Sequence, residues 1–163
     1  MNRIKSLEEG IADLLSTFSP EDIMLVEIPS RTPGFKYSED LLYCFRRKGL
    51  EIPPERRVTY IPPDSVSRRN FAERVHIGYA PHRVEQIPKT EDVHKAYIII
   101  DDSIESGATL ACAVKALEGQ GVPRRNIWFS AISGPLANQT SGILFDNVEA
   151  YVPFAPKLAE MLR

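Results

Sequence analysis

The stretch Tyr97–Leu110, YIIIDDSIESGATL, holds the residues of this 163-residue chain that are best suited to chemistry. Two adjacent aspartates, Asp101 and Asp102, follow an apolar run and precede a loop of small residues. A helix is expected to begin after that loop, and backbone N–H groups at a helix N-terminus bind phosphate where glycine allows close approach. The carboxylates would repel a phosphate but suit sugar hydroxyls or a magnesium-bound ligand. A phosphate at the loop and a ribose at the aspartates together describe a ribose 5-phosphate.

The complete string IIIDDSIESGATL resembles the phosphoribosyl-pyrophosphate (PRPP) motif of type I phosphoribosyltransferases. That motif has an apolar run, two acidic residues, an apolar residue and then Thr/Ser-Gly-x-Thr/Ser. The agreement covers 13 contiguous residues and departs from the motif at Ser103, where the family more often has an apolar residue. The acidic pair or the Ser-Gly step, taken alone, would be interpreted as part of an ordinary turn, because aspartate and Ser-Gly are both common in turns. The string as a whole favours the family.

The resemblance implies a role for each of these residues. Asp101 and Asp102 would hold the ribose hydroxyls of PRPP, directly or through Mg²⁺. The loop would bind the 5-phosphate through Glu105, Ser106, Gly107, Ala108 and Thr109. In the family branch that acts on 6-oxopurines, the acidic residue at the position of Glu105 is a general acid/base on the purine ring. A solvated loop glutamate needs no such role, so both interpretations of Glu105 stay open.

A second loop follows the expected first core strand, in the sequence EIPSRTPGFKY. Pro-Gly marks turns of any kind. In the family, however, this loop binds the pyrophosphate of PRPP through backbone amides, beside an arginine or lysine. The resemblance therefore implies pyrophosphate binding, with charge-assisted hydrogen bonds from the cations. The candidate residues are Ser30, Arg31, Thr32 and Lys36.

The segment 63–90 is polar and basic, and we expect a mobile loop or hairpin there. It is either a solvated surface hairpin with scattered arginines or the catalytic loop that the family places between its second strand and its PRPP strand. A loop that closes over a departing diphosphate needs cations and must exclude water. Arg68 and Arg69 are the candidate catalytic cations, with Arg74, His76 and Arg83 behind them. The lysine or Ser-Tyr patterns of well-known branches are not recognisable here.

Two functions follow from the resemblance. One is a Mg²⁺-dependent phosphoribosyltransferase that transfers ribose 5-phosphate from PRPP to a nitrogenous acceptor and releases pyrophosphate. The alternative is a non-catalytic regulator of the same fold that binds PRPP or a nucleotide. The acceptor is not identified by the sequence, since a widely reused fold does not fix its substrate. Type I members commonly dimerise, so the resemblance also implies a homodimer.

The elements that must position these residues can be read from the pattern of apolar side chains. Ile4, Leu7, Ile11 and Leu14 predict a first helix, which would belong to a small hood (the part that reads the base) over residues 1–20. Apolar runs predict strands at 23–29, 56–62, 96–100, 126–132 and 147–154. Helices are expected at 38–49, with Ser38 as its N-cap, at 109–121, at 135–145 and at the tail.

This alternation predicts an α/β fold with a doubly wound, mostly parallel five-stranded sheet and helices on both faces. All of residues 1–163 are expected to form a single domain of the phosphoribosyltransferase type, with the PRPP loop at 97–110. Such sheets bind ligands at the carboxyl ends of their strands. His94 precedes the PRPP strand at its amino end, and Trp128 and Phe129 fit the core, so none of the three is expected in the site.

Composition narrows the function classes further. A net charge of -2 argues against general electrostatic binding to nucleic acid or to an anionic membrane. No window has the roughly 18 apolar residues of a membrane span, and the N-terminus has no signal-peptide pattern. Cys44 and Cys112 lie in apolar helical patterns and are interpreted as reduced packing residues, with a disulfide as the minor alternative. These features predict a cytoplasmic protein.

Overall fold

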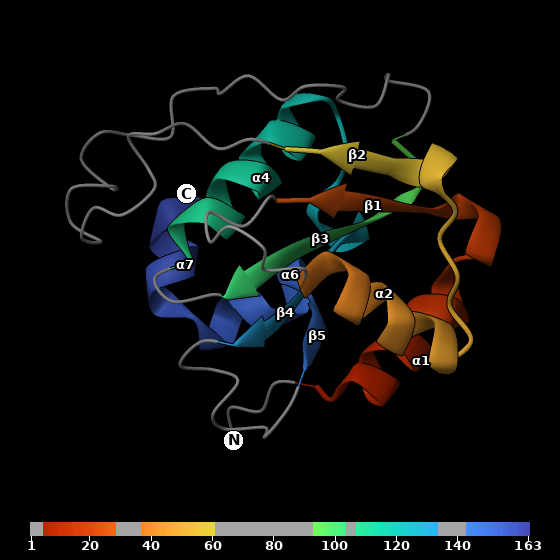
Figure 1. Cartoon of the computed structure of the whole chain (residues 1–163). Helices are drawn as coiled ribbons and strands as arrows, with labels where there is room; N and C mark the ends of the chain where they lie inside the picture. Colours follow the sequence, from red (N-terminus) through yellow and green to blue (C-terminus); the bar gives the residue numbers. More distant parts are fainter. Residues whose placement is uncertain (1–4, 29–36, 61–92, 104–106, 134–142) are drawn as a thin grey trace.

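The computed structural model describes residues 5–28, 37–60, 93–103, 107–133 and 143–163. Within these residues, five strands form one sheet in the order β2-β1-β3-β4-β5 (Figure 1). The first four strands in that order run parallel, and β5 pairs with β4 in the antiparallel direction. The expected α/β class and mostly parallel sheet are therefore confirmed. The strands are β1 Ile23–Glu27, β2 Arg57–Thr59, β3 Ala96–Ser103, β4 Ile127–Ser133 and β5 Leu144–Asn147.

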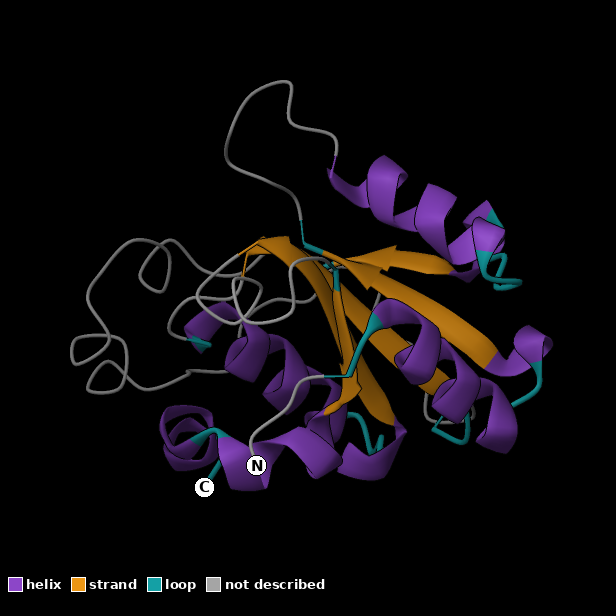
Figure 2. Cartoon of the chain, turned by 90° about the horizontal axis from the view of Figure 1, so that it is seen from below, coloured by secondary structure: helices purple, strands orange, loops and turns teal. Residues whose placement is uncertain are grey.

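Helices cover both faces of this sheet, as expected. Apolar residues of α1 and α2 pack on one face, whereas those of α4, α6 and α7 pack on the other. Figure 2 shows the strands as one twisted layer with the helices around it. None of the helices in the described ranges is long and apolar enough to cross a membrane. The helices are α1 Leu7–Thr17, α2 Tyr37–Arg47, α4 Ala108–Gly119, α6 Val148–Tyr151 and α7 Pro156–Met161.

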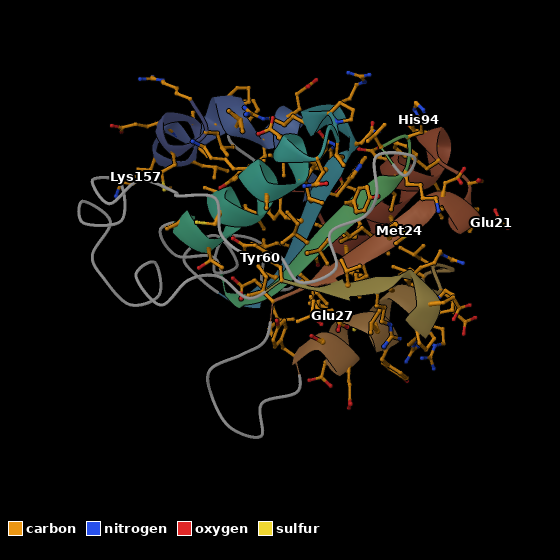
Figure 3. All side chains as sticks on the ribbon, turned by 90° about the horizontal axis from the view of Figure 1, so that it is seen from above. Glu21, Met24, Glu27, Tyr60, His94 and Lys157 are labelled. Atoms are coloured by element: carbon orange, nitrogen blue, oxygen red, sulfur yellow. The ribbon has the colours of Figure 1, made fainter. Side chains whose placement is uncertain are left out.

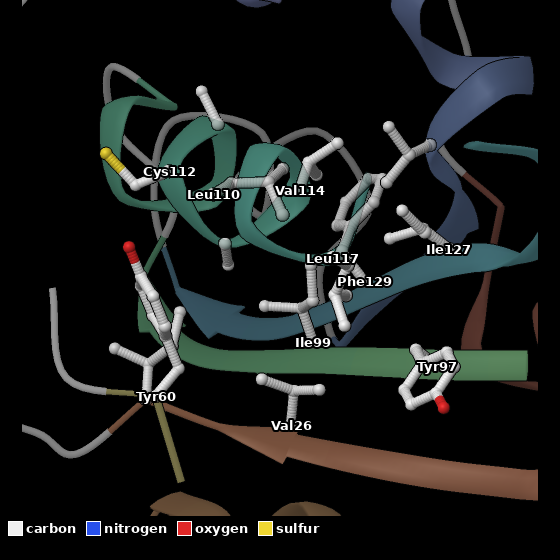
Figure 4. Packing of buried hydrophobic residues seen from close by; sticks show 14 of the residues in the cluster. Val26, Tyr60, Tyr97, Ile99, Leu110, Cys112, Val114, Leu117, Ile127 and Phe129 are labelled. Carbon is white, nitrogen blue, oxygen red and sulfur yellow. The ribbon is translucent and has the colours of Figure 1, made fainter. Parts of the chain in front are cut away.

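The central strand β3 explains why both faces are apolar. Successive side chains of a strand point to opposite faces, so Tyr97 and Ile99 join the cluster on the α4 side while Ile98 and Ile100 join the cluster on the α2 side. All four are almost fully buried. In Figure 4, Ile99 and the β4 residue Phe129 lie beneath α4. Trp128 is also buried, so the prediction that both aromatics of β4 belong to the core is confirmed.

Helix α2 begins one residue earlier than its sequence suggests. Because Tyr37 is already helical, Ser38 lies inside the first turn and is not the N-cap. The predicted end of the helix is confirmed: Gly49 has a φ of 90°, and the N–H of Leu50 donates to the carbonyl oxygen of Phe45 at 2.9 Å. Glycine adopts this left-handed conformation with little strain, which closes the helix.

The C-terminal third differs most from the sequence prediction. Leu144 and Phe145 belong to strand β5 and not to a helix, and the expected strand at 147–154 is instead α6 followed by the 3-10 helix Val152–Phe154. The turn into α6 is set by Asn147, whose side chain accepts a hydrogen bond from the N–H of Ala150 at 3.2 Å. The closing helix α7 was predicted correctly.

Cys44 and Cys112 are not joined by a disulfide. Cys112 is buried in α4, and Cys44 is partly buried in α2. The segment 63–90, the expected helix at 135–145 up to residue 142, and the beginning of the first expected helix before residue 5 lie outside the described residues.

Candidate functional site at the carboxyl edge of the sheet

The order of the strands creates a topological switch point between β1 and β3. The chain leaves β1 and reaches β2 through α2, which packs on one face of the sheet. It leaves β3 and reaches β4 through α4, which packs on the opposite face. In open α/β sheets, ligands bind in the crevice outside the carboxyl ends of the strands at such a switch. The last residues of these strands therefore define the candidate site.

Asp101 lies at this edge, near the end of β3. The strand is longer than the predicted 96–100, because its parallel pairing with β4 continues through Asp101 opposite Ala131 to Ser103 opposite Ser133. Both aspartates are thus inside the strand and not beyond it. Asp101 is only 9% exposed, and the alternation along β3 places it on the α4 side. The side chain of Asp102 lies outside what the structure describes.

Gly107 begins the helix that follows. Its φ of 84° and ψ of 3° are left-handed, and it occupies the N-cap position of α4. A Cβ added there would lie 3.5 Å from Met161 Cε and 3.6 Å from Leu158 Cδ1, which are ordinary contact distances. The backbone conformation, and not a lack of space, therefore requires glycine. The N-terminal end of an α-helix is also a place where backbone N–H groups can bind an anion.

The first helical residues differ in exposure. Ala108 is buried at 1% exposed, whereas Thr109 is partly exposed. The carbonyl oxygen of Gly107 accepts the N–H of Ala111 at 2.8 Å, so the helix is fully formed from its first turn. Helix α4 was predicted from Thr109 and begins at Ala108. Its start and the end of β3 are separated by three residues outside the described ranges.

Glu27 is a residue of this edge that the sequence prediction did not include. It ends β1, between Thr59 of β2 and Ile100 of β3, and its side chain is half-buried. Burial raises the pKa of its carboxyl, and the nearby Arg57 guanidinium opposes that rise. The signal was present in IMLVEIP, where a carboxylate interrupts an apolar strand at its last position.

Tyr60 is the second residue that the sequence prediction missed. Its N–H donates to the carbonyl oxygen of Glu27 at 2.9 Å, and its side chain is 1% exposed. Burial raises the pKa of its hydroxyl, and the neighbouring Cys112 acts in the same direction. Figure 3 shows Glu27 and Tyr60 towards one end of the sheet and His94 towards the other. The position of His94 agrees with the prediction that it is outside the site.

The structure brings part of the predicted site together. Asp101, Gly107, Ala108 and Thr109 lie at the carboxyl end of β3 and the start of α4. The other predicted residues lie outside the described residues: Ser30, Arg31, Thr32, Lys36, Arg68, Arg69, Arg74, His76, Arg83, Glu105 and Ser106. Within the described ranges, no group of three or more His, Cys, Asp or Glu side chains is placed to hold a metal ion.

Comparisons of the chain with protein-family models, with curated proteins and with solved structures found no significant match. Its function must therefore be inferred from its residues and their arrangement.

Proposed function

We propose that this chain is a phosphoribosyltransferase that transfers the ribose 5-phosphate of PRPP to a nitrogenous acceptor and releases pyrophosphate. One observation carries the proposal: the PRPP-like motif lies across the switch point of the sheet. Its acidic pair lies near the end of β3, and its glycine has a left-handed backbone at the N-cap of α4. The strand order supports the motif with residues outside it, since β1 and β4 are the neighbours of β3 in the sheet.

The start of α4 would bind the 5-phosphate. We assign this role to Gly107, Ala108 and Thr109, which lie at the positive end of a 12-residue helix. Gly107 has no Cβ to limit the approach of a phosphate oxygen to the backbone. The hydroxyl of Thr109 and that of Ser106 would add donors.

The carboxylates of Asp101 and Asp102 would hold the ribose. They accept hydrogen bonds from its hydroxyls, and their negative charge favours the positive, oxocarbenium-like sugar of the transition state. Carboxylate oxygens also suit Mg²⁺, which binds few protein ligands and prefers to share phosphate oxygens and water. Mg²⁺ would accompany PRPP and neutralise the charge that develops on the departing pyrophosphate.

In the transfer, the bond from the ribose anomeric carbon to pyrophosphate breaks, and its electron pair leaves with the pyrophosphate. A lone pair of the acceptor nitrogen forms the new bond, and the acceptor loses a proton to solvent or to Glu105. Cations stabilise the leaving group. We assign this role to Arg31 and Lys36 in the pyrophosphate loop, with Ser30 and Thr32, and to Arg68 and Arg69 in segment 63–90. A cytoplasmic homodimer is part of the same proposal.

Pyrophosphate release tests the activity. Wild-type protein with Mg²⁺ and PRPP would be assayed against a panel of nucleobases and small amines. We expect acceptor-dependent release of pyrophosphate, lost in the Asp101→Asn/Asp102→Asn double variant. Asp146→Asn is the matched control, because Asp146 is also a buried aspartate, on β5. PRPP binding with no release on any acceptor would instead favour the regulatory protein.

A further inference from the structure

Glu27 is a carboxylate at the carboxyl edge of the sheet that has no role in the proposed transfer. It is the last residue of β1, and in the register it lies opposite Thr59 of β2 and Ile100 of β3. Ile100 directly precedes Asp101. Figure 3 shows Glu27 towards the same end of the sheet as Tyr60. Glu27 is therefore beside the switch point between β1 and β3, where an α/β sheet binds its ligand.

The side chain of Glu27 lies on the face of the sheet opposite to that of Asp101. Side chains alternate along a strand, and Leu25 packs in the cluster with α2, so Glu27 is on the α2 side. Asp101 is on the α4 side, where the helix that belongs to the PRPP-like motif begins. The two carboxylates therefore flank the carboxyl edge, one on each face.

The described residues do little to compensate the charge of Glu27. Its side chain is half-buried, and none of the described residues forms a hydrogen bond or an ion pair with its carboxylate. Arg57, on the neighbouring strand, lies opposite Leu25 in the register. Its Nη2 donates to the carbonyl oxygen of Ile52 at 3.3 Å. A partly buried carboxylate without a partner is costly, and such groups are concentrated at functional sites.

The charge of Glu27 limits which ligands can bind beside it. In the proposed function, PRPP brings several negative charges to the same edge, and a carboxylate repels them. A divalent cation between the carboxylate and PRPP removes this repulsion. Mg²⁺ suits the place because it prefers oxygen ligands and is usually held by one or two carboxylates together with substrate phosphates and water.

We propose that Glu27 is a ligand of the Mg²⁺ that accompanies PRPP, directly or through water, and that it makes the site selective for the magnesium complex. This inference rests on the proposed function, in which only Asp101 and Asp102 are candidate magnesium ligands. Glu27 adds a ligand from a different strand. Its effect changes sign with the metal: Glu27 favours the binding of PRPP with Mg²⁺ and opposes the binding of PRPP without it.

Titration calorimetry of wild-type protein and Glu27→Gln with PRPP, in Mg²⁺ and in excess EDTA, measures this change of sign. With Mg²⁺, the variant should bind about tenfold more weakly, because a charge-assisted contact is lost. In EDTA, it should bind about threefold more tightly, because the repulsion by one charge is removed. Asp146→Asn, which removes a buried carboxylate on β5, should alter neither affinity. Equal losses in both conditions, or no change in either, would overturn the proposal.

Urea denaturation of the same variants without ligand tests whether the charge of Glu27 is uncompensated. Glu27→Gln should raise the urea midpoint, because the amide keeps the shape of the side chain and no longer buries a charge. A lower midpoint would show that the carboxylate has a structural partner and would overturn its assignment to the ligand.

The same titrations separate this proposal from the proposed function. Wild-type protein that binds PRPP in neither condition would overturn the proposed function, and the role of Glu27 with it. Wild-type binding of Mg²⁺–PRPP that Glu27→Gln leaves unchanged would overturn the role of Glu27 alone.

Discussion

Two buried aspartates, Asp101 and Asp146, lie in different regions of the sheet and have different surroundings. Asp101 is 9% exposed near the carboxyl end of the central strand β3, and Asp146 is 4% exposed on the edge strand β5. Burial of a carboxylate is costly unless it is paired or hydrogen-bonded, so either residue could be taken for a functional group. Their positions in the sheet distinguish the two residues.

The surroundings of Asp146 account for it structurally. Its carboxylate lies 3.3 Å from the ammonium of Lys5 and accepts the N–H of Asn147 at 2.8 Å. Ser6, the residue after Lys5, forms an antiparallel bridge with Leu144. Asp146 therefore fastens the segment before α1 to the exposed edge of β5 and closes part of that edge.

Asp101 occupies the place where an α/β sheet binds its ligand. It lies beside the switch point, directly after Ile100, which pairs with Glu27 at the end of β1, and it precedes the helix that begins after Gly107. The comparison teaches that burial of a carboxylate is a poor guide to function, whereas its position relative to the strand ends is informative. Substitutions in the two regions should therefore have different consequences.

Gly10→Ala should have the largest effect on stability, and it acts in the β5 region. An added Cβ would lie 2.3 Å from Phe145 Cδ1 and 2.6 Å from the Phe145 carbonyl oxygen, so α1 must move away from β5. Overpacking costs about 1–3 kcal/mol or more, and the gain in helix propensity offsets about 1 kcal/mol. Chemical denaturation should show a net loss of about 2 kcal/mol. The affinity of the folded protein for PRPP should be unchanged. A loss of that affinity would contradict the assignment of the β5 region to stability and not to ligand binding.

Gly107→Ala and Gly49→Ala are matched substitutions that separate an effect on the candidate phosphate site from an effect on stability. Both glycines have a φ near 90°, and neither lacks space for a methyl group. Each substitution should therefore destabilise the fold by about 1 kcal/mol through backbone strain alone. Calorimetric titration with inorganic phosphate should show weaker binding only for Gly107→Ala, since Gly49 follows α2 and lies outside the proposed phosphate site. Equal phosphate affinities in the two variants would argue against a phosphate site at α4.

Asp146→Asn should have the smallest effect, visible in the pH dependence of stability. Burial raises the pKa of Asp146 above 3.8, while Asn147 and Lys5 oppose the rise. The native state then binds the proton more tightly than the unfolded state, so this group's contribution falls as pH rises from 3.8 through the raised native pKa. The free energy of unfolding of Asp146→Asn should decline less over that window in urea titrations at several pH values. A steeper decline would show that the ion pair with Lys5 outweighs burial.

Much of the fold was predictable because its signals are local. The apolar run before Asp101 and the apolar face of α4 fix β3 and its helix regardless of partners. Strand β5 was missed because its pairing is tertiary: LFDN is a short run whose partner, β4, lies before a segment outside the described residues. The apolar residues in 147–154 predict a strand, whereas the cap at Asn147 starts helix α6 instead.

The candidate site was predictable only where its residues share one motif. Asp101 and Gly107 stand six residues apart, so their chemistry could be read directly from the sequence. Tyr60 follows β2 and Cys112 lies in α4, and their place in one buried cluster depends on tertiary packing that no spacing along the chain predicts. Glu27 became part of the edge only once β1 was found beside β3.

Titration calorimetry with Mg²⁺–PRPP tests the central claim most directly. Wild-type protein and Asp146→Asn should bind with the same affinity. The Asp101→Asn/Asp102→Asn variant should bind about 100-fold more weakly or worse, since hydrogen bonds to charged groups contribute about 1.5–3 kcal/mol each. No binding by the wild type, or equal binding by the double variant, would contradict a ribose site at the end of β3.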